Sequence, residues 1–567
     1  MRSLIAALLL AALVVPMAPA AEQAELLPDY PLEILNIKPV GTDGMEASNR
    51  IFRAYPGLRY NIRAAVIGGR YPYSFRLTEA PDGMTVDARN GEVDWPTPRA
   101  SAKAKLEVTD SAGKKITAEW TVTVTKEKFI FVDAKNGKRA SEGATGTIEN
   151  PFKTIADFYP NEEQKGLRTS KYTDHVVYFR AGTYKLDGFK CGWGTKWMDF
   201  RNWHPNILAG YPGEEAIIDC ESKHCLTAKG QSGFCVENLR FRGMKNYGYA
   251  LQLMPELGDL KYVTVRKCDF RGLGPTTGNH NQSFIRLLVG GNLTEGLVVQ
   301  DCVFDGGEHL SGIKLYTCYR SLIEDNRFAN FKGLDSAVAL KVCVRRCVVR
   351  HNVMHGFEKG HGAVNCLFSQ PYRNKFYKGI SENEICYNLA YDLRSCAGLS
   401  IFAHANPGSA DVYRNTLVGP VILRHVGSKA GPFRFYRNVY VREGGGGKTE
   451  LRKVSDPSRI VEKENLVVNR SELNDKFLLR NEDARRKYGH WLPEPEAPKA
   501  KKGGTPKAAA AAVEKRQAAS PKAAALYRAA RGAERSGMKD LARTLYGRLV
   551  EEHPESPLAA EAKKRLH

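Results

Sequence analysis

Three cations occupy matched positions in successive segments near the middle of the chain. The segments are Ile285-Arg286-Leu287, Ile313-Lys314-Leu315 and Val338-Ala339-Leu340-Lys341. If each segment is a β-strand, the apolar neighbours face inward and the polar residue faces outward, because side chains alternate across a strand. We therefore expect Arg286 and Lys314 to be neighbours on one outer surface, with Lys341 on the next strand and two residues along.

The chemistry open to such a face is proton abstraction next to a carboxylate. Removing the proton beside a uronate carboxylate needs a base, a cation or metal that neutralises the carboxylate, and a donor for the departing oxygen. Lys341 or Lys314 is the predicted base, and Arg286 is the predicted clamp on the carboxylate. The alternative interpretation is a row of solvated surface charges without a catalytic role.

Acidic side chains cluster in the turns before two of these strands. Asp305, Glu308 and His309 precede Lys314, and Asp335 precedes the next strand. Ca²⁺ prefers oxygen ligands such as carboxylates. We expect Asp305, Glu308 and Asp335 to be calcium ligands and His309 to contact the substrate.

Aromatic and histidine side chains extend the candidate groove. Trp193, Trp197 and Trp203 lie within eleven residues of each other, and aromatic faces stack on sugars. They are predicted substrate contacts, with a cap on the open end of the fold as the alternative. His361 is a further predicted contact, with an ordinary turn histidine as its alternative reading.

A repeat in the same region indicates the fold that must position these residues. Seven steps from residue 239 to residue 438 give about 28 residues per step, with β-type segments and no helical pattern inside the repeat. This period predicts a right-handed parallel β-helix over residues 128–475, in which like residues stack about 4.8 Å apart. The equivalent middle positions are Leu239, Cys268, Cys302, Asn326, Asn352, Asn383, Asn415 and Asn438.

Two internal stacks follow from that alignment. The asparagines are predicted to form a ladder of hydrogen-bonded amides inside the turns. Phe241, Phe270, Phe304 and Phe328 are predicted to stack in the core. Cys268 and Cys302 share the ladder position, which favours packed thiols, whereas Cys220 and Cys225 flank a turn and form the first pair to consider for a disulfide.

The first coils carry motifs of a known family. Val132-Asp133-Ala134, the run from Gly146 to Ile155, the run from Val177 to Tyr184 and Gly210-Tyr211-Pro212-Gly213 resemble the pectate-lyase-like family of secreted β-helix proteins. The resemblance implies a Ca²⁺-assisted lyase that uses Lys or Arg as its base. A lyase would cleave an acidic, uronate-containing polysaccharide by β-elimination.

A second resemblance points to hydrolysis. The run from Asp335 to Lys341, followed by Gly360-His361-Gly362, is similar to the polygalacturonase pattern. Glycoside hydrolysis needs a pair of carboxylates, and Ser336 stands where that pattern has an aspartate. A polygalacturonase-like hydrolase is therefore the second alternative, after a non-catalytic glycan-binding or cell-surface scaffold.

The N-terminal part predicts export followed by a small β-sandwich. Residues 1–20 read as a signal peptide, with an apolar run from Leu4 to Val15 and cleavage near Ala20 and Ala21. No other stretch is long and apolar enough to span a membrane, so we expect a secreted or periplasmic protein. Residues 28–127 resemble cadherin-like and immunoglobulin-like modules, with turns at Pro81-Asp82-Gly83 and Asn90-Gly91.

The C-terminal part predicts a linker and a helical tail. Residues 476–522 are rich in Pro, Ala and Lys, which is typical of a linker. Residues 523–567 resemble one tetratricopeptide-type helical pair, which could dock a protein partner. Three such repeats normally make a stable solenoid, so a lone pair is a docking tail or a marginal hairpin.

Charge and composition narrow the partners. With 84 Lys and Arg against 62 Asp and Glu, the formal net charge is +22, which favours anionic partners. For an exported protein these are acidic polysaccharides or a negatively charged cell envelope rather than nucleic acid. The hydrophobic content of 43% excludes a disordered chain and a coiled coil, because it is enough to bury a core.

Overall fold

Strands dominate this computed structural model. It describes residues 28–42, 45–158, 172, 174–185, 198–200, 206–220, 224–230, 232–244, 249–255, 258–272, 282–288, 292–308, 311–333, 336–367, 380–403, 408–443, 447, 449–488, 523, 526, 527, 530, 539–554 and 556–566. The chain divides into two compact units, residues 1–493 and residues 494–567. The predicted signal peptide, residues 1–20, lies outside the described residues.

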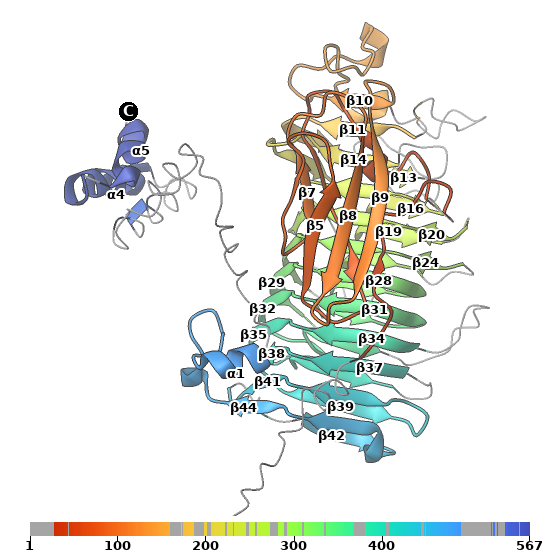
Figure 1. Cartoon of the computed structure of the whole chain (residues 1–567), viewed down its shortest axis with the longest axis vertical. Coiled ribbons are helices and arrows are strands. Elements are labelled where there is room, and N and C mark those ends of the chain that lie inside the picture. Colours follow the sequence, from red (N-terminus) through yellow and green to blue (C-terminus); the bar gives the residue numbers. More distant parts are fainter. Residues whose placement is uncertain are drawn as a thin grey trace, which may run out of the picture. The chain divides into compact units, whose positions relative to one another are not determined.

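Three parallel sheets form the β-helix, and most coils contribute one strand to each sheet (Figure 1). The first sheet contains β10 (Phe129–Val132), β11 (Val176–Phe179), β14 (Ile207–Gly210), β17 (Cys235–Glu237), β21 (Thr264–Arg266), β25 (Val298–Gln300), β28 (Cys318–Glu324), β31 (Val344–Arg350), β34 (Ile380–Cys386), β37 (Gly408–Tyr413), β40 (Phe433–Tyr436) and β43 (Ile460–Lys463), with β20 (Leu260–Lys261) and β24 (Thr294–Glu295) beside this path. The second sheet contains β12 (Gly182–Lys185), β15 (Ala216–Asp219), β18 (Leu239–Arg242), β22 (Asp269–Arg271), β26 (Val303–Glu308), β29 (Arg327–Lys332), β32 (Val353–Phe357), β35 (Leu389–Leu393), β38 (Thr416–Leu417), β41 (Val439–Val441) and β44 (Leu466–Val468). The third sheet contains β13 (Met198–Phe200), β16 (His224–Lys229), β19 (Tyr249–Met254), β23 (Ser283–Leu287), β27 (Ser311–Leu315), β30 (Val338–Leu340), β33 (Val364–Leu367), β36 (Leu399–Phe402), β39 (Val421–Val426) and β42 (Thr449–Val454). This architecture confirms the predicted parallel β-helix.

A residue with left-handed backbone turns the chain from the first sheet into the second. Asp301 (φ 57°), Asp325 (φ 55°), His351 (φ 61°) and Tyr387 (φ 55°) hold this position in successive coils. The next residue points its side chain inward, where it can meet its equivalents in the coils above and below. The turn therefore produces two columns of side chains. The left-handed residues form the column outside the β-helix, and the residues that follow them form the column inside it.

The inner column is the asparagine ladder, with one correction to the prediction. Nδ2 donates to the next Oδ1 at 3.0 Å along the series Asn326, Asn352, Asn388, Asn415, Asn438 and Asn465. Asn383 was expected in this ladder and is not in it. Its amide instead bonds the backbone of Val344 and Cys347, both at 3.1 Å, beside a register shift in β34. The repeat is longer here, 36 residues from Asn352 to Asn388, so an alignment on even spacing selects the wrong asparagine.

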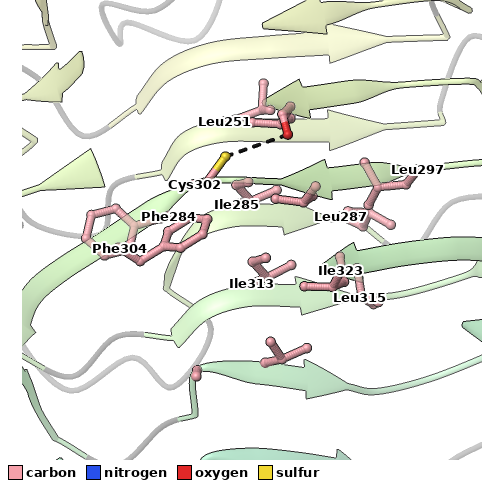
Figure 2. Close-up of a cluster of buried hydrophobic side chains, with 14 of the residues drawn as sticks. Leu251, Phe284, Ile285, Leu287, Leu297, Cys302, Phe304, Ile313, Leu315 and Ile323 are labelled. Atoms are coloured by element: carbon pink, nitrogen blue, oxygen red, sulfur yellow. Dashed lines mark hydrogen bonds between the residues drawn. The ribbon is translucent and has the colours of Figure 1, made fainter. Parts of the chain in front are cut away.

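The core confirms the predicted aromatic stack. The rings of Phe241, Phe270, Phe304 and Phe328 lie parallel, with centroids 4.8, 4.9 and 4.7 Å apart. Figure 2 shows Phe304 beside Phe284 and the aliphatic side chains of neighbouring coils. Stacking of like residues follows from the coil spacing of about 4.8 Å, since a ring can pack on its equivalent at that distance.

The described cysteines are all free. Cys268 and Cys302 are buried and their thiols donate to backbone carbonyls, which confirms that they pack as thiols at the ladder position. Cys220 and Cys225 are also free and buried, so the disulfide considered for them is not formed. Burial raises the pKa of the Cys220 thiol well above its ordinary value.

The N-terminal module is a β-sandwich with its own core. One sheet has the order β2 (Arg53–Ala54), β9 (Lys115–Val124), β8 (Ala102–Asp110) and β5 (Tyr73–Glu79), and the other has β3 (Tyr60–Arg63), β7 (Glu92–Trp95) and β6 (Thr85–Val86). A separate pair joins β1 (Glu33–Ile34) to β4 (Val66–Ile67). Buried side chains from both sheets, including Phe75, Trp95 and Trp120, fill the space between them.

The sandwich packs on the outer face of the first sheet. Ile67 and Leu35 join an apolar cluster with Val298 and Leu322 of the β-helix, and β5, β8 and β9 lie along the β-helix in Figure 1. The buried guanidinium of Arg63 crosses the junction to the carboxylates of Asp301, Glu324 and Asp325. The sandwich therefore covers most of the outer face of the first sheet, from β10 to β40, whereas Lys463 of β43 is exposed.

Short helices complete the described structure. Single turns of 3₁₀-helix occur at Arg50–Phe52, Ala140–Glu142, Ile155–Asp157, Pro457–Arg459 and Arg470–Glu472. The packed part of the first unit extends beyond residue 475, because Leu473, Leu479 and the short α1 (Glu482–Lys487) join a cluster with Val439 and Val468. The second unit contains α4 (Lys539–Glu552) and α5 (Pro557–Leu566), which share a small core. Among the described residues, no helix has the length and hydropathy needed to cross a membrane.

Candidate functional site

The predicted cations lie on the outer face of the third sheet. Gln252 of β19, Arg286 of β23 and Lys314 of β27 are aligned in register on successive coils. The same column continues through Ala339 of β30, Asn365 of β33 and Ser400 of β36. Strand alternation accounts for this face, since the flanking Ile285, Leu287, Ile313 and Leu315 are buried in the core.

These polar side chains are buried, which a solvated surface row would not be. Lys314, Asn365 and Ser400 each expose 1% of their surface, and Gln252 exposes 9%. Lysine is almost never fully buried unless it is paired. The alternative of a row of solvated charges therefore does not hold for Lys314.

Several buried polar atoms near this column lack partners. Within the described part of the chain, neither amide atom of Asn365 makes a hydrogen bond, and neither does Nε of Arg286. The same is true of both amide atoms of Gln282 and of the hydroxyl of Ser336. Buried polar groups are nearly always hydrogen-bonded, so Asn365 and Arg286 offer atoms whose hydrogen bonds water or a ligand can supply.

Two tyrosines that the sequence reasoning missed lie between the cations. The guanidinium of Arg286 lies 5.0 Å from the ring centre of Tyr249 and 6.0 Å from that of Tyr316, and it donates to the Tyr249 hydroxyl. Lys341 places Nζ 5.1 Å from the ring centre of Tyr316. Tyr316 directly follows the strand that contains Lys314, and this position in the sequence could have identified it as a neighbour of the cations. Tyr249 is the first residue of β19.

Lys341 joins the group from just beyond the end of β30. Its backbone amide donates to the carbonyl of Leu315 at 3.0 Å, which sets it beside the neighbouring coil. Its half-buried side chain then reaches the Tyr316 ring from the coil beyond Lys314. The structure thus brings Arg286 and Lys341 to one tyrosine, with Lys314 aligned beside Arg286.

Only one of the predicted calcium ligands has a described side chain. Asp305 belongs to β26 in the second sheet, where Asn330 donates to it at 2.6 Å and Arg271 lies 3.5 Å away. It is therefore on a different sheet from Lys314. Glu308 ends β26, its side chain is not among those described, and Asp335 lies outside the described residues. No group of three potential metal-binding side chains occurs among the residues that were described, so the donor set needed for Ca²⁺ is not met there.

The remaining predicted contacts are only partly placed. His361 lies half-buried in the turn before β33. His309, Trp193, Trp197 and Trp203 lie outside the described residues. Their predicted contacts with substrate stay predictions.

Comparisons with known proteins find only distant structural likenesses. No family model matches the chain, and no curated protein matches it. Among solved structures, a family 28 exopolygalacturonase of Yersinia enterocolitica is 10% identical, with 77% of this chain and 98% of that chain covered and a TM-score of 0.28. A mannuronic acid specific polysaccharide family 6 lyase from human gut microbiota is 14% identical, with 56% and 86% covered and a TM-score of 0.30. The complex of XylC with xylose is 9% identical, with 57% and 70% covered and a TM-score of 0.33. Likenesses at these scores do not identify an activity for this chain.

Proposed function

We propose that the protein is an exported lyase that cleaves an acidic, uronate-containing polysaccharide by β-elimination on the outer face of the third sheet. One observation carries the proposal: the polar column holds the half-buried Arg286 and the buried Lys314 and Asn365, together with polar atoms that have no partner among the described residues. Unpartnered hydrogen-bonding atoms of Asn365 and Arg286 in a column that also carries Lys314 favour an anionic polar ligand, because buried polar atoms are costly to leave without hydrogen bonds. The predicted signal peptide supports export.

The reaction assigns one task to each type of side chain. Arg286 pairs with the uronate carboxylate, so that the negative charge that develops on proton removal is stabilised. Lys314 or Lys341, in its uncharged amine form, takes the proton from the carbon next to the carboxylate, and the electron pair forms a carbon–carbon double bond as the glycosidic bond to the neighbouring carbon breaks. The leaving oxygen takes a proton from a donor, for which the hydroxyl of Tyr249 or Tyr316 is the candidate.

The amide groups of the column suit the hydroxyls of a sugar. Asn365 offers two donors and an acceptor that no described residue uses. Gln252 lies in register with Arg286 on the other side of the cations, and Thr227 Oγ1 lies 3.4 Å from its Oε1. A bound sugar would therefore meet neutral hydrogen-bonding groups on both sides of the charged centre.

The predicted Ca²⁺ site stays a prediction, because the side chain of Glu308 and all of Asp335 lie outside the described residues, and the reaction as written needs no metal ion. Asp305 is committed to Asn330 and Arg271, and the donor set was not found among the described residues. The cations of the column can neutralise the carboxylate without a metal ion. The earlier prediction of a Ca²⁺ requirement is tested directly by adding a chelator to the assay.

The column also favours elimination over hydrolysis. A glycoside hydrolase needs two carboxylates separated by roughly 5 to 9.5 Å across the bond that it cleaves. From Gln252 to Ser400, the described members of the column are neutral or cationic. A lyase, whose base can be a lysine, matches this set of side chains more closely.

The first test is the ultraviolet absorbance of the unsaturated uronate that a lyase releases. The mature chain is incubated with pectate, alginate and glycosaminoglycans, with Ca²⁺ or with EDTA. Lys314→Met, Lys341→Ala and Arg286→Met are compared with Lys429→Met, which removes an exposed lysine far along the chain. We expect loss of the base to lower the rate by about 10² to 10⁴-fold while binding is retained.

Each outcome of this test separates the candidate functions. New reducing ends without absorbance would identify a hydrolase. No cleavage of any acidic glycan, with binding retained, would identify the non-catalytic scaffold. Equal rates for the wild type, Lys314→Met and Lys341→Ala would show that the third sheet does not supply the base.

A further inference from the structure

A second groove runs along the corner between the first and second sheets. It has a volume of about 540 Å³ and spans three successive coils. This volume falls within the roughly 300 to 1,000 Å³ that is typical of small-ligand sites. The described residues that line it are Asp325, Asn326, Arg327, His351, Asn352, Val353, His355, Tyr387, Leu389 and Tyr391.

The floor of this corner groove is apolar and its rim is polar. Val353 and Leu389 are aligned in register with Arg327 on the outer face of the second sheet. His355 and Tyr391 stand two residues further along the same strands, with ring centres 5.0 Å apart. A ligand lying here would meet an aliphatic surface below it and hydrogen-bonding groups at its edges.

The acidic group of the groove is already hydrogen-bonded within the protein. The Asp325 carboxylate accepts from the buried guanidinium of Arg63 and lies 2.5 Å from Nδ1 of His351. These partners hold the pKa of Asp325 well below its ordinary value, against the opposing effect of burial. Among the described residues, Asp325 is the one hydrogen-bonding partner of the His351 ring, so Nε2 is left for a ligand.

Arg327 supplies a positive charge that makes no ion pair with a carboxylate among the described residues, although Asp305 and Asp392 lie near enough to act on the neighbouring His355. Its side chain is exposed, and within the described part of the chain its one hydrogen bond goes to Nε2 of His355 at 3.2 Å. Burial and the Arg327 charge both lower the pKa of His355, so at neutral pH this ring is uncharged and accepts the bond. The groove therefore presents one arginine with unused donors beside a polar histidine edge.

We propose that this groove binds an acidic sugar residue of a polysaccharide, with the carboxylate on Arg327 and the apolar face of the ring on Val353 and Leu389. The match is one of chemistry: a uronate has a flat C–H face, hydroxyls at its rim and a single negative charge. Arginine is well suited to carboxylates because its guanidinium offers two parallel donors.

The corner groove is separate from the proposed catalytic face. It lies where the first sheet turns into the second, whereas Arg286 and Lys314 belong to the third sheet. Such a second site would hold a polysaccharide chain on the enzyme between cleavage events. Its acidic ligand class accords with the proposed function, but binding at the groove does not require the third sheet to be catalytic.

Calorimetric titration of the full chain tests the proposal. The probes are hexasaccharides of galacturonate and of mannuronate, with a neutral glucose hexasaccharide for comparison. The probes are added both to the wild type and to Lys314→Met. In Lys314→Met the proposed base is missing, so cleavage cannot distort the titration. Arg327→Met removes the charge, and Val353→Phe fills the groove without changing the charge. Arg99→Met is the matched control, since it removes an exposed arginine of the sandwich.

We expect an acidic hexasaccharide to bind at the groove in both parents, and Arg327→Met and Val353→Phe to weaken that binding by at least about tenfold. Arg99→Met should leave it unchanged. Titrations of Arg327→Met that match those of Arg99→Met would overturn the proposal, as would equal affinity for the neutral hexasaccharide. Cleavage is measured separately. Cleavage without binding at the groove would show that the groove proposal is wrong, and binding at the groove without cleavage would show that the lyase proposal is wrong.

Discussion

Arg63 is the side chain whose loss should most affect the junction between the sandwich and the β-helix. It exposes 2% of its side chain and contacts three carboxylates, with Asp301 at 2.6 Å and Glu324 at 3.2 Å, and Asp325 as the third. Removing one partner of a buried ion pair costs about 3 to 5 kcal/mol. Glu324 keeps a second arginine and Asp325 keeps His351, so we expect Arg63→Met to cost about 3 kcal/mol, the lower end of that range.

Urea-induced unfolding and amide hydrogen exchange of β3 measure this effect. Burial raises the pKa of Asp301, and Arg63 opposes that rise. Without Arg63 the carboxyl should take up a proton more readily, which relieves the uncompensated charge in mildly acidic solution. The loss of stability should therefore be larger at alkaline than at acidic pH, and exchange in β3 should speed up first.

The matched control is Arg59→Met. Arg59 pairs with Asp94 but exposes 56% of its side chain, so we expect a loss of less than about 1 kcal/mol. If Arg63→Met and Arg59→Met had equal stabilities, the junction would not depend on the buried charge. If the loss of stability in Arg63→Met did not change with pH, the uncompensated charge of the carboxylates that Arg63 contacts would not be its cause.

Three further predictions concern the β-helix itself. Asn388→Ala should cost about 3 kcal/mol in urea unfolding, because it orphans buried ladder partners on both sides, whereas Asn465→Ala at the ladder's end should cost about 1 kcal/mol; equal losses would contradict the ladder. Burial raises the pKa of Glu384 from 4.5 to about 7, so its protonated form stabilises the fold at acidic pH and this contribution, at most about 3 kcal/mol, is lost as the pH rises through 7. Glu384→Gln should flatten the pH dependence of the melting temperature over this range, and an unchanged profile would show that the group does not titrate there. Phe304→Ala should cost about 3 to 5 kcal/mol, since it removes a fully buried ring from the stack, and a loss below 1 kcal/mol would indicate a core that collapses around the gap.

The β-helix was predictable because its signals are local. A short apolar run, a turn and a ladder residue recur in each coil, and the alternation of side chains within a strand identifies which residues face inward. The positions of Phe241 to Phe328, the thiols of Cys268 and Cys302, and the register of Arg286 with Lys314 all follow from this pattern. Asn383 shows its limit, because a coil of unequal length shifts the register without a local signal.

The tertiary structure decided which side chains of different coils, and of the sandwich and the β-helix, lie next to each other. Asp305 precedes Lys314 by nine residues, yet the turn between β26 and β27 directs it to another sheet. Tyr249 and Tyr316 join the cations from coils on either side of Arg286, and Arg63 reaches Glu324 from 261 residues away. The sequence by itself therefore determined the strands, their inward faces and the stacking repeat, because these depend on neighbours along the chain. Burial of Lys314 and Asn365, the covering of the first sheet and the formation of the corner groove depend on contacts between distant segments, and only folding in three dimensions establishes those.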